Sequence, residues 1–359
     1  MGDIGYTSCV IKYLGSKRVL LPWIVQTLQQ IDALVPVRTV CDLFSGSARV
    51  GHALKAQGYF VIANDLYTYA FVLAQALVEA NRQAYPPEYV KPILEHLQNL
   101  PPEPDWFTRT YCEQAHYFQP PNGARIEAIR NAIETDYSDD PLLKAILLTS
   151  LMLAADKVDS TTGLQMAYLK RWAPRSYNEL VLSYPPLLLG DGKAYQMDAR
   201  TLASELEADL FYLDPPYNQH SYIGNYHVWE TLVRWDQPST YGVAQKRWDV
   251  RERTSDFNSK RRAKQAFTNL VHSIRAQHLM VSFNDEGFFR CDEVETILKE
   301  WGYVVRQVRP YKRYIGAQIG IYNPQGQRVG TVSHTTNHEL LFIATKSRAV
   351  YTHFASVSP

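Results

Sequence analysis

Two apolar strands, each followed by small or polar residues, do most to limit the folds available to this chain. Residues Val40–Gly51 predict a strand, a turn of small residues and the start of a helix. A second predicted strand follows at Phe60–Ala63 and ends in Asn64 and Asp65. Strands that alternate with helices are typical of α/β folds with a parallel sheet, in which ligands bind beyond the carboxyl ends of the strands.

The turn after the first strand contains Gly46, and Asp65 lies 19 residues further along. A small-residue turn lets a nucleoside cofactor approach the backbone at a helix N-terminus. In dinucleotide-binding folds an acidic residue about 20 residues on holds the ribose hydroxyls. The turn reads Phe-x-Gly-x-Ala and carries no nicotinamide-specific pattern. A nicotinamide oxidoreductase is therefore the least favoured interpretation.

A second motif follows the apolar run Leu210–Leu213, which predicts a short buried strand. The motif is Asp214-Pro215-Pro216-Tyr217, whose prolines end the strand and fix the backbone at its exit. An exocyclic base amine suits this arrangement, because it can donate to the carboxylate and to a proline carbonyl while the tyrosine ring stacks on the base. Plain turn chemistry is the alternative for the tetrapeptide taken alone.

A third segment lies near the N-terminus, where Lys12 and Lys17 flank a Tyr-x-Gly turn that begins at Tyr13. Two lysines around such a turn are suited to holding a carboxylate. The alternative is a solvated basic turn in front of a helix, which the apolar stretch from Leu20 to Ile24 predicts.

The order of these motifs resembles that of the alpha-group N6-adenine DNA methyltransferases, the DNA adenine methylase family, over most of the chain. Members carry a Lys-Tyr/Trp-x-Gly-x-Lys segment, Phe-x-Gly-x-Gly, an acidic residue after the next strand, a recognition insert and Asp-Pro-Pro-Tyr. Here these match residues 12–17, 44–48, Asp65 and 214–217. One departure is Ala48, where the family usually has glycine. We expect cofactor binding to survive, provided that the turn avoids a positive φ at this residue.

The resemblance implies an α/β fold, with a Rossmann-like S-adenosylmethionine-dependent methyltransferase sheet and a mostly helical insert. S-adenosylmethionine is the implied cofactor, and no metal is expected. Lys12 and Lys17 would approach its methionine end, and Asp65 would hold its ribose hydroxyls. The implied cofactor-binding residues are Lys12, Tyr13, Lys17, Phe44, Gly46, Asp65, Asp198 and Asp214.

The implied reaction moves a methyl group to the N6 amine of an adenine at a specific site in double-stranded DNA. Asp214 and the Pro215 carbonyl would accept the amine hydrogens, and the Asp214 carboxylate would stabilise the positive charge that develops on the nitrogen. The base must leave the duplex, with Tyr217 as its stacking partner. The predicted catalytic residues are Asp214, Pro215, Pro216 and Tyr217.

Charge along the chain points to a surface for the nucleic acid. The formal net charge of the 359 residues is only +1, but the segment 246–264 holds eight positive and three negative residues. Interleaved aromatic residues favour phosphate contact there over a solvated charged face. The predicted nucleic-acid-binding residues are Lys246, Arg247, Arg251, Arg253, Lys260, Arg261, Arg262 and Lys264, with Lys170 from the polar stretch 157–172.

The organisation along the chain predicts a catalytic domain formed by residues 1–81 and 185–359. Helical periodicity between Ala124 and Ala155 predicts a mostly helical insert at 82–184, a candidate target-recognition region. Further strands are predicted at 278–284, 304–311 and 339–344. The glycine-rich stretch 313–334 suits a hairpin or a mobile loop over the DNA.

Several alternatives stay open. An RNA base-amine methyltransferase and a non-catalytic nucleic-acid-binding protein with a methyltransferase fold share much of this pattern. The sequence has no run of 18 apolar residues and no charged-then-apolar leader, so we expect a cytoplasmic protein without a membrane segment. A cognate restriction endonuclease is a candidate partner. The oligomeric state is open, with a monomer as the prior expectation.

Overall fold

The chain folds as two compact units, unit 1 (residues 1–206 and 220–255) and unit 2 (residues 207–219 and 256–359). These boundaries differ from those predicted for the catalytic domain and the insert, which stay a prediction. Lys170 and most of the glycine-rich stretch lie outside the residues that the structure describes. The computed structural model describes residues 10–166, 171–219, 221–284, 287–312, 321–322, 328–330 and 336–357.

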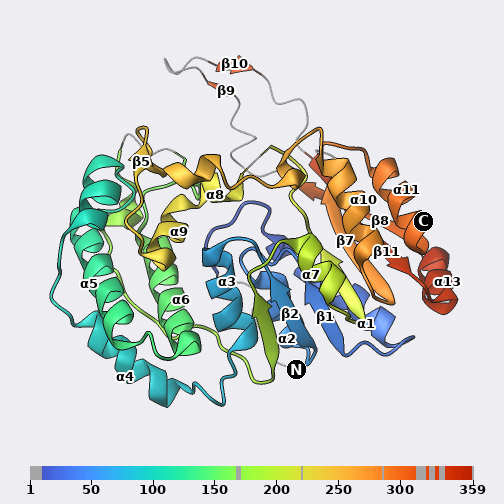
Figure 1. Cartoon of the computed structure of the whole chain (residues 1–359), viewed down its shortest axis with the longest axis horizontal. Coiled ribbons are helices and arrows are strands. Elements are labelled where there is room, and N and C mark those ends of the chain that lie inside the picture. The colour runs from blue at the N-terminus through green and yellow to red at the C-terminus, as the bar shows by residue number, and fades with distance from the viewer. Residues whose placement is uncertain are drawn as a thin grey trace. The chain divides into compact units, whose positions relative to one another are not determined.

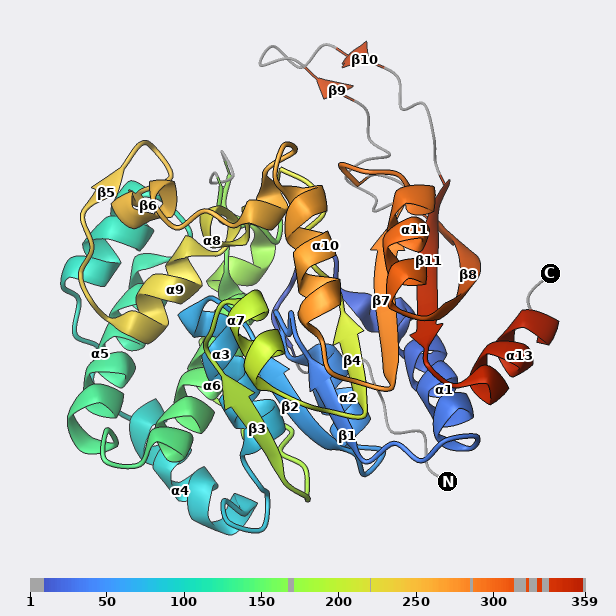
Figure 2. The ribbon, with the colours of Figure 1, turned by 45° about the vertical axis from the view of Figure 1, so that its right-hand side comes forward.

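Unit 1 contains three parallel strands, β1 (Thr39–Asp42), β2 (Phe60–Asn64) and β3 (Gly192–Tyr195), with β2 in the middle. Figure 2 shows them side by side. Val40 pairs with Val61, and both side chains are fully buried. Because the strands are parallel, their carboxyl ends meet at one edge of the sheet. The residues that follow β1 and β2 are therefore brought together there, as the sequence predicts.

Within the stretch from Tyr85 to Ser183 in unit 1, the described residues form helices and no strands. Its longest helices are α5 (Pro120–Asp136) and α6 (Pro141–Val158), which pack against each other, with α4 (Pro87–Gln98) against α5 (Figure 1). Proline occupies the first turn of each helix, where its missing N–H costs nothing. Asp140 caps α6 by accepting two backbone N–H groups. Most of α6 is buried, which explains its apolar sequence on every side.

The described residues of unit 1 form further helices and strands. They are η1 (Lys17–Val19), α1 (Leu21–Asp32), α2 (Arg49–Lys55), α3 (Thr68–Ala74), η2 (Gln75–Glu79), η3 (Thr108–Gln114), η4 (Pro174–Tyr177), α7 (Ala199–Glu205), α8 (Tyr222–Asn225), α9 (His227–Arg234), β5 (Thr240–Tyr241), β6 (Lys246–Arg247) and η5 (Trp248–Arg251).

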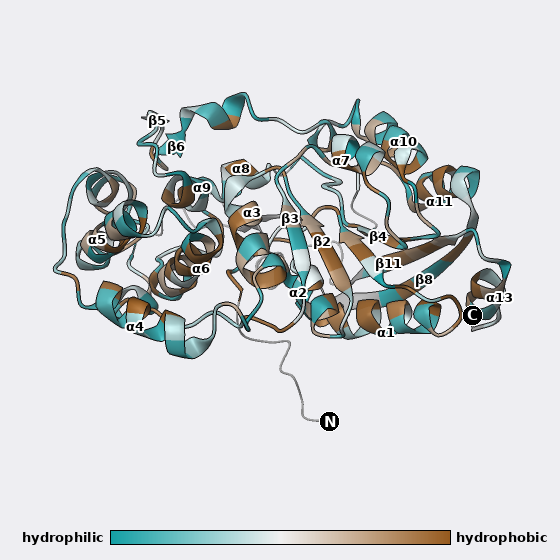
Figure 3. Ribbon diagram, turned by 60° about the horizontal axis from the view of Figure 1, so that its bottom comes forward, coloured by the Kyte–Doolittle hydropathy of each residue, from teal (hydrophilic) through white to brown (hydrophobic). Residues whose placement is uncertain are grey.

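Unit 2 contains a mixed sheet in the order β4 (Leu210–Leu213), β7 (His278–Asn284), β11 (Thr336–Thr345) and β8 (Tyr303–Lys312). The β4 and β7 strands are parallel, and β11 is antiparallel to both of its neighbours. Figure 3 shows β11 largely in the brown of hydrophobic residues, in accord with its buried run from Leu340 to Ala344. The strands predicted in this part of the chain are confirmed.

The remaining elements of unit 2 are η6 (Asp256–Asn258), α10 (Ala263–Ser273), α11 (Cys291–Trp301), β9 (Ile321–Tyr322), β10 (Arg328–Gly330) and α13 (Arg348–Val357). Parallel strand pairs in both units, with helices between them in the chain, confirm the predicted α/β class and fit a Rossmann-like methyltransferase. Among the described residues, no helix is both long and apolar enough to cross a membrane.

Candidate active site

The turn after β1 joins three of the predicted cofactor-binding residues in unit 1. The backbone N–H of Gly46 donates to Asp65 Oδ2 at 2.8 Å. Gly46 has φ +54°, and a Cβ atom there would lie 2.9 Å from Cε1 of Tyr13. Glycine is therefore needed twice, for its left-handed backbone and for the close approach of the tyrosine ring. Gly46 and Asp65 are therefore in direct contact at this edge of the sheet, and their contact with a cofactor stays a prediction.

Asp65 is half-buried, and backbone donors fix both of its oxygens. Its Oδ1 accepts the N–H of Tyr67 at 3.1 Å, while Oδ2 holds Gly46. Burial raises the pKa of Asp65 to about 6, against the lowering effect of the N–H groups of Tyr67 and Gly46. At neutral pH the side chain is mainly an anion, which can accept hydrogen bonds from hydroxyl groups.

Ala48 corrects one sequence expectation. Its φ is 60° and its ψ is 12°, so the prediction that the turn avoids a positive φ at this residue is wrong. The reason is that Ala48 must serve two hydrogen bonds at once. Its N–H donates to Ser45 O at 2.8 Å, and its own carbonyl accepts the N–H of His52 at 2.9 Å. The tight turn and the start of α2 together impose a conformation that costs alanine about 1–2 kcal/mol.

Tyr13 lies in a stack of aromatic rings. Its ring centroid is 5.3 Å from that of Tyr222 and 4.8 Å from that of Tyr226, with nearly parallel planes. Its hydroxyl is 3.2 Å from that of Tyr69. Burial raises the pKa of Tyr13 well above its usual value, so the hydroxyl stays protonated. Sequence reasoning did not single out these partners, which lie far along the chain from residue 13.

Lys12 is held by acidic groups at the end of α6. Its ammonium contacts the Asp156 carbonyl and lies 2.9 Å from Asp159 Oδ1. Burial raises the pKa of Asp156 to about 6, and the nearby Lys12 opposes that rise. Lys17 is buried within η1. The contact of both lysines with the methionine end of a cofactor stays a prediction, and Asp156 and Asp159 were missed by sequence reasoning.

Asn64 ties a further loop to this edge of the sheet. Its amide nitrogen donates to Leu43 O at 3.1 Å, and its oxygen accepts the N–H of Met197 at 3.1 Å. Asp198 follows Met197 and caps α7 by accepting the N–H of Arg200 at 3.0 Å. Phe44, half-buried, follows Leu43 in the turn. The loops that carry Phe44 and Asp198 are therefore joined through Asn64, although Asp198 itself has a capping role.

In unit 2 the Asp-Pro-Pro-Tyr motif follows the fully buried strand β4. The Tyr217 hydroxyl accepts the Nδ2–H of Asn284 at 2.9 Å, and its ring lies 5.2 Å from that of Phe283. The Tyr217 carbonyl accepts the N–H of Phe288 at 2.8 Å. Asp214 is half-buried and Pro215 is buried. The end of β7 therefore fixes the tyrosine ring at the exit of β4.

The basic segment 246–264 divides into two kinds of residue. Arg247 is 1% exposed and forms a bidentate pair with Asp236, at 2.6 and 2.8 Å. Arg253 pairs with Glu230 at 2.6 Å. Arg251 instead is exposed, with its guanidinium over the rings of Tyr241 and Trp248. Lys260, Arg261, Arg262 and Lys264 are exposed, the last two paired with Asp256 and Glu293, and Lys246 is half-buried.

Comparison with known proteins gives a family match over residues 13–297, described as D12 class N6 adenine-specific DNA methyltransferase. The chain is 32% identical over 327 residues to the modification methylase StsI of Streptococcus sanguinis and to the type II methyltransferase M.FokI of Planomicrobium okeanokoites. It is 30% identical over 322 residues to the type II methyltransferase M.NlaIII of Neisseria lactamica.

Each of these alignments covers 85% of the chain. The chain spans about half of the StsI and FokI proteins, at 49% and 50% of their lengths, and 92% of the NlaIII protein. With the family match over most of its length and the predicted motifs in place, the chain belongs to the D12 class of N6 adenine-specific DNA methyltransferases.

Proposed function

We propose that the protein methylates the N6 amine of adenine at a specific site in double-stranded DNA, with S-adenosylmethionine as cofactor. Family membership supports the reaction class. The observation that carries the proposal is the pairing of Asp214 with a fixed Tyr217 at the exit of a buried strand. This arrangement offers one acceptor for an amine hydrogen and one aromatic face for a base.

The edge of the sheet in unit 1 fits the cofactor. Gly46 leaves no room for a side chain at the turn, and Asp65 offers an anionic acceptor beside it. The buried Ser45 hydroxyl has no hydrogen-bond partner in the described structure, which leaves it available to a polar ligand group. When bound, S-adenosylmethionine supplies a methyl group activated by its sulfonium.

The residues of the motif would position the base and make its amine nitrogen a better nucleophile. The Asp214 carboxylate and the Pro215 carbonyl accept the two amine hydrogens, which turns the nitrogen lone pair away from the ring. The ionised Asp214 also stabilises the positive charge that develops on that nitrogen. Tyr217 stacks on the base, and its hydroxyl bond to Asn284 limits rotation of the ring. Pro216 keeps the turn rigid between the two functional side chains.

DNA contact is best assigned to the exposed members of the basic segment. Lys260 and Arg261 are exposed, and Arg251 presents a cation stacked on two aromatic rings. Arg247 is buried in ion pairs, so we assign it a structural role. The helical stretch 82–184 remains our candidate for target recognition.

The biological setting is also a proposal. The relatives are named as modification methylases and type II methyltransferases, which favours a restriction-modification role with a cognate endonuclease in the cytoplasm. We propose a monomer as the active form.

One competition experiment distinguishes DNA from RNA as the substrate that accepts the methyl group. Labelled S-adenosylmethionine is offered with equal amounts of unmethylated bacterial DNA and total RNA in the same tube. We expect label in the DNA, because the family acts there. Label found only in RNA would show that RNA, and not DNA, is the substrate. Cofactor binding without label in either polymer would favour a non-catalytic binding protein.

A further inference from the structure

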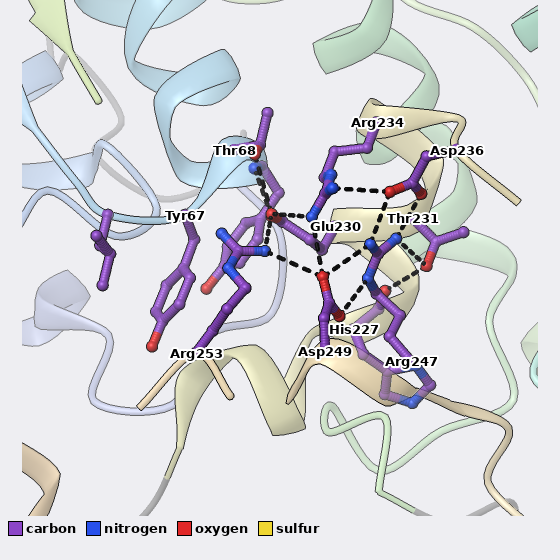
Figure 4. Close-up of polar contacts among 12 residues, drawn as sticks. Tyr67, Thr68, His227, Glu230, Thr231, Arg234, Asp236, Arg247, Asp249 and Arg253 are labelled. Atoms are coloured by element: carbon purple, nitrogen blue, oxygen red, sulfur yellow. Dashed lines mark hydrogen bonds and ion pairs between the residues drawn. The ribbon is translucent and has the colours of Figure 1, made fainter. Parts of the chain in front are cut away.

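Glu230 in α9 is a fully buried carboxylate with three close partners in unit 1, and Arg234 lies 4.0 Å from its Oε1 as a fourth. It accepts the N–H of Tyr69 at 3.1 Å and the hydroxyl of Thr68 at 2.9 Å, and it pairs with Arg253 at 2.6 Å. Figure 4 shows the Glu230 side chain between Arg253 and Thr68. A buried carboxylate is tolerated only with such a set of donors, so its position is strongly determined.

The contacts of Glu230 fix the first turn of α3. Thr68 and Tyr69 are the first two residues of that helix, and Tyr67, its N-cap, provides no side-chain cap. Glu230 therefore satisfies an N–H group that the helix itself leaves without a partner. Its negative charge also lies at the positive end of the helix dipole. The start of α3 thus depends on a residue more than 160 positions along the chain.

The same turn of α3 holds two of the proposed cofactor-binding residues. The N–H of Tyr67 donates to Asp65 at 3.1 Å, directly before the helix. The Tyr69 hydroxyl lies 3.2 Å from that of Tyr13, whose ring packs against Gly46. A shift in the first turn of α3 would therefore move the Asp65 carboxylate and the Tyr13 ring together.

Arg253 lies in the segment after η5, and ion pairs of Arg247 hold the neighbouring part of that segment. Arg247 binds Asp236 and Asp249 in the same region of the chain, and Asp249 also lies 3.8 Å from Arg253 (Figure 4). The Arg253 guanidinium lies 5.5 Å from the centre of the Tyr67 ring. Arg253 thus contacts both the carboxylate that holds α3 and the residue in front of that helix.

We propose that Glu230 and Arg253 form a positioning pair for the cofactor site. The pair holds the first turn of α3 in place. It thereby positions the Asp65 carboxylate for the ribose hydroxyls and the Tyr13 ring against Gly46. On this account Arg253 acts on cofactor affinity, whereas the nearby Arg251 acts on DNA. The inference rests on the proposed function, because it assumes that the cofactor binds at Asp65.

The test uses the full chain and S-adenosylhomocysteine as the probe. Its dissociation constant is measured by calorimetry for wild type, Arg253→Met and Arg251→Met, and the affinity for a DNA duplex is measured by fluorescence anisotropy. We expect Arg253→Met to raise the dissociation constant of the probe roughly tenfold, since the variant cannot donate a hydrogen bond to the charged Glu230. DNA affinity should stay unchanged. Arg251→Met should weaken DNA binding and leave the dissociation constant of the probe unchanged.

Two further variants separate positioning from a purely structural role. Arg253→Lys keeps the charge and should recover part of the probe affinity. Glu230→Gln keeps the size of the side chain and should weaken the probe at temperatures where circular dichroism shows a folded protein. Wild-type probe affinity in Arg253→Met and Glu230→Gln would overturn the inference, and so would a loss of DNA affinity in Arg253→Met with the probe unaffected.

Asp65→Ala distinguishes failure of this inference from failure of the proposed function. If wild type does not bind the probe, or Asp65→Ala binds it as wild type does, the proposed cofactor site itself is wrong. If Asp65→Ala loses the probe while Arg253→Met and Glu230→Gln keep it, only the positioning role is wrong.

Discussion

At the scale of single residues, Asp65 has both a structural role and a proposed role in cofactor binding. Its two oxygens hold the N–H groups of Gly46 and Tyr67, which fixes the rotamer before any ligand arrives. Burial places its pKa at about 6, within reach of ordinary buffers. The charge state of this one side chain should therefore be visible in cofactor binding.

Cofactor binding should depend on pH through the titration of Asp65. Folded Asp65 has a pKa of about 6 against an ordinary 3.8, so its contribution to folding stability is present below pH 3.8 and is lost as the pH rises through about 6. Cofactor affinity should instead rise with pH through this range, because the ionised carboxylate accepts hydrogen bonds from the ribose hydroxyls more strongly than the protonated form does. We expect the affinity for S-adenosylhomocysteine to fall by up to about tenfold per pH unit below 6.

Asp65→Asn provides the control for this measurement. The amide does not titrate, so its affinity should be weak and nearly independent of pH. Asp156 also has a pKa of about 6, and its titration would persist in the variant. An equal pH profile for wild type and Asp65→Asn would assign the dependence to Asp156 or another group.

Ala48 gives a prediction about stability. Glycine adopts the left-handed conformation of this residue without strain, although it gains more freedom in the unfolded chain. The balance should make Ala48→Gly more stable by about 0.5–1 kcal/mol in chemical denaturation. Gly46→Ala is the matched opposite change and should destabilise, because its Cβ would meet the Tyr13 ring. A loss of stability in Ala48→Gly would contradict this explanation of the turn.

At the scale of elements, the short strands β5 and β6 and the turn η5 are fixed by charge more than by packing. Arg247 donates to Asp236, to Asp249 and to the Thr231 hydroxyl, while Arg234 pairs with both of these aspartates. Arg130 donates to the last carbonyls of α9, those of Leu232 and Val233. The buried arginines Arg247 and Arg130 thus connect β6 and η5 to α9, and α9 to the helical stretch, within unit 1.

Removal of Arg247 should be costly. Arg247→Met leaves Asp236 and Asp249 without their main partner, and these carboxylates are about one third exposed, so water compensates in part. We expect a loss of about 3 kcal/mol in the free energy of unfolding. Arg109→Met is the matched control, because the Arg109 side chain is 60% exposed and its ion pair, with Asp105, lies within one helix turn. Equal losses in the two variants would contradict a structural role for Arg247.

The sequence predicted those parts of the site that local pattern controls. Leu210–Leu213 formed the expected strand because four apolar residues are followed by Asp214 and two prolines, which end a strand. The spacing of Gly46 and Asp65 follows from one βαβ unit. Glu230 could not be predicted in the same way. It lies inside a short amphipathic helix and meets Thr68 only through the tertiary fold. Ala48 shows the same limit, since neighbouring hydrogen bonds override its local preference.

At the scale of the whole molecule, a nearly neutral chain would have to bind the proposed DNA substrate through local charge. The formal net charge is +1, so non-specific attraction over the entire surface is weak. Neutralising the exposed Lys260 and Arg261 together should lower the slope of log affinity against log salt by roughly two, because each cation would otherwise neutralise one phosphate of the DNA. The measurement is anisotropy with a duplex at several salt concentrations.

A double variant of equal charge change controls for the removal of two cations. Lys299 and Arg348 are exposed in α11 and α13, outside the basic segment, and Lys299→Gln with Arg348→Gln should leave the slope unchanged. If both double variants change the slope equally, the segment 246–264 has no special part in DNA binding.

Analysis of the methylated product tests whether the protein transfers methyl groups to adenine with Asp214 at the reacting amine. Wild type and Asp214→Ala are incubated with unmethylated DNA and S-adenosylmethionine, and the digested nucleosides are quantified by mass spectrometry. We predict N6-methyldeoxyadenosine with wild type and a decrease of at least about a hundredfold with the variant, whose affinity for S-adenosylhomocysteine should be nearly unchanged. Normal transfer by Asp214→Ala, or methyl groups on another base, would contradict the account.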